Sequence, residues 1–237
     1  MDGKRTYREY CAIARSLDLL GQRWTLLIVR DLFLGPQRYT DLQAGLPGIA
    51  SDILTARLRT LEDKGLVRRR ELPPPAPATV YELTEAGRLL GPLIRALGEV
   101  GLTLLDTPAP DQPINPGPVV MSLNLRFRAD EAGDLTETYG LELDGQAFTV
   151  AVDRGTVTTE RGAPASPAAT FRTDARTLVE LLRGDTTPTA VEADGALEVE
   201  GDRAALARFA ALFLGSQSTS DVTAERAGLT NTRAPTS

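Results

Sequence analysis

Five prolines within the twelve residues Thr107–Pro118 divide this 237-residue chain into two parts. Proline lacks a backbone N–H and clashes with a preceding helical turn, so this run can neither continue a helix nor join a central strand. We therefore expect an extended linker over residues 107–118, between one domain at 1–106 and another at 119–214. Residues 215–237 are rich in Ser, Thr and Ala, which predicts a disordered tail.

The composition excludes several classes of protein. The chain has no histidine and a single cysteine, which removes the commonest general base and the zinc sites built from Cys and His. No stretch approaches the roughly 20 apolar residues of a membrane span, and the N-terminus lacks the apolar run of a signal peptide. With one cysteine, a reducing cytoplasm is expected. We predict no metal, no cofactor and no enzymatic activity, although carboxylate chemistry remains open.

The net charge of −6 is unevenly divided. Residues 1–105 hold 15 Lys and Arg against 12 Asp and Glu, a balance of +3, and the remainder holds 11 against 20, a balance of −9. The first part can approach phosphates, whereas the second repels them. A balance of +3 is also common on ordinary protein surfaces.

Helical periodicity prevails before the linker. Thr6 and Glu9 match a capping box, and Gly21 is a typical helix stop, so a first helix is predicted between Thr6 and Gly21. Further helices are predicted at Trp24–Leu34, Thr40–Ala44, Asp52–Lys64 with Ser51 as N-cap, and Thr84–Leu105, with strands at Leu66–Leu72 and Thr79–Leu83 around the proline-rich loop Pro73–Ala78.

A short helix, a tight turn at Gly45–Ala50 and a capped amphipathic helix follow the order of a helix-turn-helix. Three leucines of the second helix fall on one side and should pack inward: Leu54, Leu58 and Leu61. The opposite side should face a DNA major groove and holds Asp52, Thr55, Ala56 and Arg59. A surface helix of an ordinary small bundle would show the same pattern.

Each outward side chain has a candidate role. Thr55 is predicted to read a base edge or a thymine methyl, and Arg59 to bind a guanine or a phosphate. Asp52 would accept a hydrogen bond from cytosine, or simply favour the helix N-terminus. Arg68, Arg69 and Arg70 lie on the first predicted strand, where they would neutralise phosphates. The alternative for these arginines is a solvated charge run.

At these residues the first part resembles the HxlR-type winged-helix regulators, which are related to the MarR type. The resemblance rests on Cys11–Arg15, Leu20–Ile28, Gly35–Leu42, Leu46–Ile49, Leu54–Glu62, Gly65–Val67 and Tyr81–Gly87. It implies a homodimer joined by the terminal helices of this domain, bound to two-fold symmetric DNA with its recognition helices roughly 34 Å apart. The predicted DNA contacts are Arg38, Thr40, Ser51, Asp52, Thr55, Ala56, Arg59, Arg68, Arg69 and Arg70. The chain departs from the family pattern at Ala12, where proline is usual, and in a less basic recognition helix.

Cys11 has two interpretations. On a continuous first helix, Arg8 and Arg15 would flank it and favour its thiolate, and some members of the resembled family use a cysteine here as a redox sensor. Any disulfide would then join two subunits. Alternatively, Cys11 fills space at the edge of the apolar stripe.

The second part reads as an α+β layer, an antiparallel sheet covered by helices. Strands are predicted at Val119–Phe127, Gln146–Val152, Thr156–Glu160, Ala168–Arg172 and Gly195–Gly201, and helices at Ala175–Arg183 and Arg203–Leu214, capped by Asp174 and Asp202. This part resembles a sterol-carrier-protein domain, on Ala168–Asp174, Leu178–Gly184, Ala190–Gly195 and Leu197–Asp202. The resemblance implies a tunnel for an apolar ligand, with no residue assigned to it. The alternative is a solid core that serves dimerisation.

The patterns favour a dimeric DNA-binding regulator, a repressor or an activator, tuned by an apolar ligand. Two alternatives stay open. In one, the chain is a lipid or small-molecule binding protein or enzyme in which the winged helix is a scaffold. In the other, the winged helix serves protein contacts.

Overall fold

The computed structural model describes residues 6–73 and 77–214. The predicted tail at 215–237 and the middle of the predicted proline-rich loop, residues 74–76, lie outside these ranges. Among the described helices, none combines the length and the apolar character needed to cross a bilayer.

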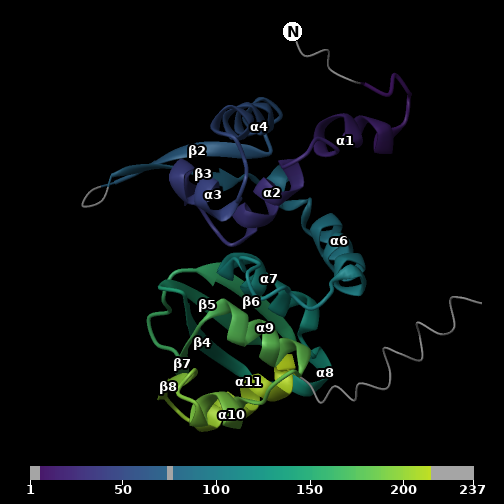
Figure 1. Ribbon diagram of the computed structural model, residues 1–237. Coiled ribbons are helices and arrows are strands. Elements are labelled where there is room, and N and C mark those ends of the chain that lie inside the picture. The colour runs from purple at the N-terminus through teal and green to yellow at the C-terminus, as the bar shows by residue number, and fades with distance from the viewer. Residues whose placement is uncertain (1–5, 74–76, 215–237) are drawn as a thin grey trace, which may run out of the picture.

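Helices surround a small sheet in the first part of the chain (Figure 1). Its elements are α1 (Ala12–Leu20), α2 (Thr25–Phe33), β1 (Gln37–Arg38), α3 (Tyr39–Gly45), α4 (Ser51–Asp63), β2 (Val67–Leu72), β3 (Ala78–Leu83), α5 (Glu85–Arg88) and α6 (Gly91–Leu104). The three strands pair in the order β1-β3-β2, all antiparallel. This order of helices and hairpin confirms the predicted winged helix-turn-helix.

Three local predictions in this part are wrong. Residues 6–10 form no helix, because the Thr6 hydroxyl and the Tyr7 N–H bond to the Asp18 carboxylate instead of starting a capping box. The helix begins after Cys11. The predicted helix at 84–105 is divided into α5 and α6, although Thr84 does cap α5 by accepting from the Gly87 N–H. Ser51 is the first residue of α4, whose N-cap is Ala50.

The second part of the chain packs helices against a five-stranded sheet. Its elements are α7 (Pro116–Arg126), α8 (Ala129–Ala132), β4 (Thr136–Leu143), β5 (Gln146–Asp153), β6 (Thr156–Arg161), β7 (Ala169–Thr173), α9 (Ala175–Arg183), α10 (Pro188–Ala193), β8 (Glu198–Gly201), α11 (Ala204–Phe209) and the π-helical turn η1 (Ala210–Leu214). The expected α+β layer is confirmed. The expected all-antiparallel sheet is wrong, because the order is β6-β5-β4-β7-β8 and β4 pairs with β7 in parallel. After β6 the chain crosses to the free side of β4, and β7 then runs in the same direction.

The predicted strand at 119–127 is the helix α7, which also takes up the end of the predicted linker. Asn115 caps it by accepting from the Gly117 N–H, and Pro116 stands in the first turn, where a missing N–H costs nothing. Val119, Val120 and Leu123 are buried at helical spacing. The alternation of polar and apolar residues in this stretch was therefore misleading.

Each of the two parts has its own hydrophobic core. The first gathers Ile28, Leu42, Leu54 and Leu58, among others, between the helices and the small sheet. The second lies between the five-stranded sheet and α7, α9 and α11. Leu34, which follows α2, packs into this second core, so the two parts share an apolar contact.

Polar bonds join the two parts beside Leu34. The Arg161 N–H donates to the Leu34 carbonyl at 2.8 Å, and Asn115 Nδ2 donates to the Gly45 carbonyl at 2.6 Å. Asp31 lies here with 1% exposure, and its Oδ2 has no hydrogen-bond partner among residues 6–73 and 77–214. Burial raises the pKa of Asp31, while the nearby guanidinium of Arg30 opposes the shift.

Candidate nucleic-acid interface

Helix α4 has the two faces that the sequence predicts. Leu54, Leu58 and Leu61 are each no more than 1% exposed. The outward residues line one surface depression: Ser51, Asp52, Thr55, Ala56, Arg59, Thr60 and Asp63. In Figure 1, α4 lies at the end of the molecule far from the five-stranded sheet. The acidic second part therefore leaves this face uncovered.

Helix α3 braces the start of α4 through two side chains that the sequence analysis missed. The Tyr39 hydroxyl donates to the Ser51 carbonyl at 2.8 Å, and Gln43 Nε2 donates to Ser51 Oγ at 2.6 Å. Tyr39 and Gln43 stand four residues apart on one face of α3, a spacing that could have indicated their shared role. The brace fixes the angle between the two helices of the helix-turn-helix.

The Thr55 hydroxyl is already used within the protein. It donates to the Ser51 carbonyl at 2.8 Å and lies 3.2 Å from the Tyr39 hydroxyl. Its one hydrogen is therefore committed to the helix backbone. The methyl group is the part of this side chain left for a ligand.

The outward face of α4 is not basic. Arg59 is the one cation among the residues that line the depression, beside Asp52 and Asp63. It forms no ion pair within the described parts of the chain. Arg57, on the same helix, instead donates to the Arg23 carbonyl at 3.3 Å.

The three arginines of β2 all have carboxylate partners. Glu82 on β3 accepts from Arg68 Nε at 2.7 Å and from Arg70 Nε at 3.0 Å. The hydrogen bond from Arg70, and then that from Arg68, lower the pKa of Glu82. Arg69 points to the other face of the hairpin, where it lies 3.5 Å from Glu62 and over the ring of Tyr81.

Arg38 and Thr40 lie at the start of α3 and are exposed. The Arg38 N–H and the Thr40 hydroxyl both bond to the Asp41 carboxylate, at 3.3 and 3.4 Å. The Arg38 guanidinium is left at the surface. Arg38 and Thr40 flank Tyr39, whose hydroxyl bonds to Ser51 at the start of α4. In the sheet, β3 separates Arg38 on β1 from the arginines of β2.

Comparison with known proteins now decides the family. Residues 19–108 match the sequence model of the HxlR-like helix-turn-helix family. An uncharacterised HTH-type transcriptional regulator of Synechocystis is 38% identical over 96 residues, which cover 40% of this chain and 71% of that protein. The chain belongs to the HxlR-like helix-turn-helix family. It is therefore a DNA-binding transcription regulator, and the predicted family resemblance is confirmed.

Among solved structures, this HxlR-like domain is similar to a MarR-family regulator from Porphyromonas gingivalis that is described as putative. The identity is 30%, the match covers 43% of this chain and 99% of that one, and the TM-score is 0.39.

The second part of the HxlR-like chain matches a family other than the one expected. Residues 119–219 match the model described as alkyl sulfatase C-terminal. The sec-alkylsulfatase Pisa1 from Pseudomonas is 18% identical, with coverage of 41% of this chain and 16% of the enzyme, at a TM-score of 0.38. The sterol-carrier resemblance stays a prediction. The match spans about a sixth of the enzyme, so the sulfatase activity in its name is a property of that enzyme and is not transferred to this chain.

Cys11 stands at the N-cap of α1 and is partly exposed. The expectation that Arg8 flanks it on the same helix is wrong, because Arg8 precedes the helix with a φ of 53°. Arg15 is one turn further on, and its N–H donates to the Cys11 carbonyl at 3.0 Å. One of the two cations expected to favour a thiolate is therefore misplaced.

Helices α1 and α6 carry large apolar side chains that are exposed at the surface. Tyr10, Ile13 and Leu17 of the α1 region are 43% exposed or more, at spacings of three and four residues. On α6, Leu93, Val100 and Leu104 are 40–74% exposed. Figure 1 shows α1 and α6 on the same side of the first domain.

Proposed function

We propose that the chain acts as a homodimer that recognises two-fold symmetric DNA through α4 and the β2–β3 wing. The observation that carries this proposal is the outward face of α4, which is exposed, braced by Tyr39 and left uncovered by the acidic second part. In a symmetric dimer, the two α4 helices enter successive major grooves, about 34 Å apart. We place the protein in the cytoplasm, where it would meet its DNA.

The α4 side chains divide between reading and positioning. Thr55 presents its methyl to a thymine, because its hydroxyl is held by Ser51. Arg59 binds a guanine edge, with Ala56 leaving room beside it. Asp52 accepts from a cytosine or stabilises the helix N-terminus, and Ser51 stands at the phosphate edge of the groove.

The wing supplies weaker phosphate contacts than three free arginines would. Arg68 and Arg70 share Glu82, so together they contribute about one net positive charge. Arg69 is opposed by Glu62. Arg38 and Thr40, at the start of α3, meet the phosphates on the other side of the groove.

Fluorescence anisotropy on a duplex selected by the parent protein from a random pool tests this interface. Arg59→Ala should lower specific binding by about 1–3 kcal/mol, whereas Arg69→Ala should weaken binding to all sequences alike and flatten the salt dependence. Arg57→Ala is the matched control, because Arg57 is on the same helix but bonds to the Arg23 carbonyl. If Arg59→Ala and Arg57→Ala both bind like the parent, the assignment of faces is wrong.

The dimer forms through the exposed stripes of α1 and α6. Removing such apolar side chains from water favours association of two copies. Val100→Glu would place a charge in the contact, so it should yield a monomer by light scattering and lose cooperative DNA binding. Ala165→Glu is an exposed control in the second part. A dimer that persists in Val100→Glu would place the contact elsewhere.

We propose further that the second part is a non-catalytic domain through which an apolar ligand modulates DNA binding. The sequence lacks histidine, and among residues 6–73 and 77–214 no group of three His, Cys, Asp or Glu could hold a metal ion. The sterol-carrier resemblance supports a ligand of this kind. Shifted DNA affinity on addition of an apolar compound would support modulation, and unchanged affinity with the compound bound would contradict it.

Cys11 stays a candidate redox sensor, with a space-filling role as its alternative. Diamide treatment followed by a non-reducing gel separates the two. A disulfide-linked dimer band that Cys11→Ser abolishes supports sensing, and its absence supports the space-filling role.

A further inference from the structure

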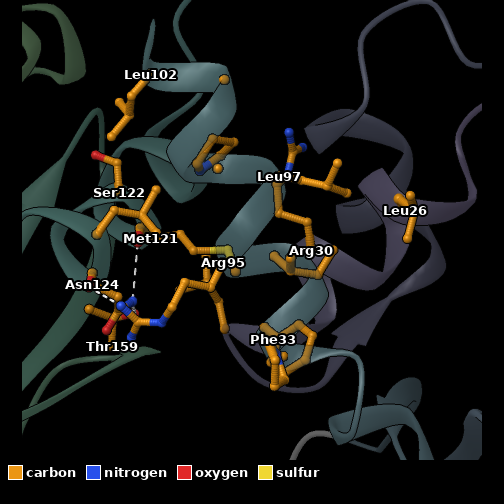
Figure 2. A pocket seen from close by; sticks show the side chains of 18 of the residues that line it. Leu26, Arg30, Phe33, Arg95, Leu97, Leu102, Met121, Ser122, Asn124 and Thr159 are labelled. Atoms are coloured by element: carbon orange, nitrogen blue, oxygen red, sulfur yellow. Dashed lines mark hydrogen bonds between the residues drawn. The ribbon is translucent and has the colours of Figure 1, made fainter.

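An apolar groove of about 890 Å³ lies between the two parts of the chain. Figure 2 shows its two walls, with Leu26, Phe33 and Leu97 of the first part across from Met121, Asn124 and Thr159 of the second. The groove is in the size range of small-molecule sites, about 300–1,000 Å³. It therefore has room for a ligand that touches both α2 and α6 of the DNA-binding domain and α7 and β6 of the other.

Helix α6 is apolar on two opposite faces, and no residue of it is buried. Ile94, Gly101 and Leu105 line the groove. Leu93 and Val100 do not, and the helical repeat places them on the far side of α6. If a second copy of the chain docks on the Leu93 and Val100 face of α6, it does not fill the groove on the opposite face. The groove therefore needs an occupant other than the dimer partner.

The charges at the groove identify the kind of partner. Three arginines and one glutamate line it: Arg30, Arg88, Arg95 and Glu160. Arg30 is paired with the buried Asp31 at 2.8 Å. Arg88 and Arg95 form no ion pair within the described residues, and Arg95 Nη1 donates to the Asn124 carbonyl at 3.2 Å. The groove wall therefore combines apolar area with a net positive charge.

The interior of the second domain offers less room. The rings of Tyr139, Phe171, Phe209 and Phe213 fill the space between the sheet and α11, with ring centroids 4.6–6.0 Å apart in successive pairs. Such aromatic contacts occupy the region where a sterol-carrier-like tunnel was expected. The groove between the domains is open by comparison.

We propose that this groove binds an amphiphilic anion, an alkyl chain with one negatively charged head group. The chain lies against Phe33, Leu97 and Met121, and the head group lies at the Arg88 and Arg95 side. This inference rests on the proposed ligand modulation and moves the ligand from inside the second domain to the junction. A ligand in the groove contacts the helix that also carries the proposed dimer stripe.

Calorimetric titration of the full chain with dodecanoate, below its micelle concentration, tests the proposal. Saturable binding with one site per chain is expected, and dodecyltrimethylammonium, of the same chain length but opposite charge, should bind at least about fivefold more weakly. Arg88→Gln should lower dodecanoate affinity by about threefold to fivefold. Equal binding of the anion and the cation would overturn the assigned charge.

Gly101→Leu is the variant that plugs the groove. A Cβ at Gly101 meets no atom within 4 Å, and leucine is a better helix former than glycine, so the variant should fold. Its side chain occupies the ligand's place, and dodecanoate affinity should fall by about tenfold or more. Glu99→Leu is the matched control, the same new side chain on the same helix but outside the groove. Binding unchanged in Gly101→Leu, or lost equally in both variants, would refute the groove as the site.

The same variants separate this inference from the proposed function. Without dodecanoate, Gly101→Leu should bind the selected duplex like the parent, because the residues that line the groove and those that line the depression on α4 do not overlap. A chain that binds dodecanoate in the groove but no duplex would contradict the regulator proposal and leave the ligand site standing. The reverse result would contradict the ligand site alone.

Discussion

Two substitutions at Thr55 separate the methyl group from the hydroxyl group in DNA recognition. Thr55→Ser keeps the hydroxyl and removes the methyl, whereas Thr55→Val keeps a methyl at nearly the same volume and removes the hydroxyl. The hydroxyl donates to the Ser51 carbonyl at 2.8 Å, so DNA would have to compete with the helix for it. We expect the methyl to carry the contact.

The magnitude follows from one buried methyl group. Removing it from contact with a thymine methyl costs about 0.8 kcal/mol, which is about fourfold in the dissociation constant. Thr55→Val should stay within about twofold of the parent, since valine and threonine have similar helix propensities. Ser51 keeps its bond from the Tyr39 hydroxyl in both variants.

The assay is fluorescence anisotropy on the duplex selected by the parent, with each thymine replaced in turn by uracil, which lacks the C5 methyl. One replacement should weaken the parent about fourfold and leave Thr55→Ser unaffected. If Thr55→Val binds weakly while Thr55→Ser binds like the parent, the hydroxyl reads the base and the reasoning fails.

Two further predictions concern the buried carboxylates of Glu82 and Asp31. Glu82→Gln should release Arg68 and Arg70 from their shared ion pairs and so add about one net positive charge at the wing. The slope of log affinity for DNA against log salt concentration should then steepen by about 0.9. An unchanged slope would mean that neither arginine contacts a phosphate. Asp31 should make the free energy of unfolding depend on pH, because burial raises the pKa of its carboxyl group in the folded state. The stabilisation from the protonated carboxyl group is fully present below the pKa of Asp31 in the unfolded chain. It is lost as pH rises through the pKa of Asp31 in the folded state. The unfolding free energy of Asp31→Asn relative to the parent should therefore increase as pH rises above the ordinary aspartate pKa of about 3.9, as chemical denaturation would measure. A difference that stays constant with pH would contradict a raised pKa of Asp31.

The DNA-binding domain could be predicted from the sequence because its signals are local. The spacing of Leu54, Leu58 and Leu61 fixes the inner face of α4, and the outer face follows by geometry. The start of the first helix was misplaced because Asp18, far along the chain, captures the Thr6 hydroxyl that would otherwise cap it. No pattern in the sequence indicated the ion-pair partner of Arg68 and Arg70, because Glu82 becomes their neighbour only when β2 pairs with β3.

The second domain was harder to predict for a related reason. Strand β4 was missed, although it lies in the centre of the sheet and pairs with both β5 and β7. Gly140 in its middle weakens the strand pattern, and a Cβ there would lie 2.7 Å from Thr170 Oγ1 on β7. The reason for this glycine is a neighbour thirty residues away, which no local pattern reveals. The same holds for the junction, where Arg161 meets Leu34.

Helix α6 links the three proposals physically. One face carries the dimer stripe, the other lines the ligand groove, and the dimer sets the spacing of the two α4 helices. A ligand that shifts α6 changes that spacing and hence the fit to DNA. Linkage then requires reciprocity: if dodecanoate weakens duplex binding by some factor, the duplex must weaken dodecanoate binding by the same factor. A titration of dodecanoate with and without saturating duplex measures this factor, and a factor of one would show that a ligand in the groove does not act on DNA binding.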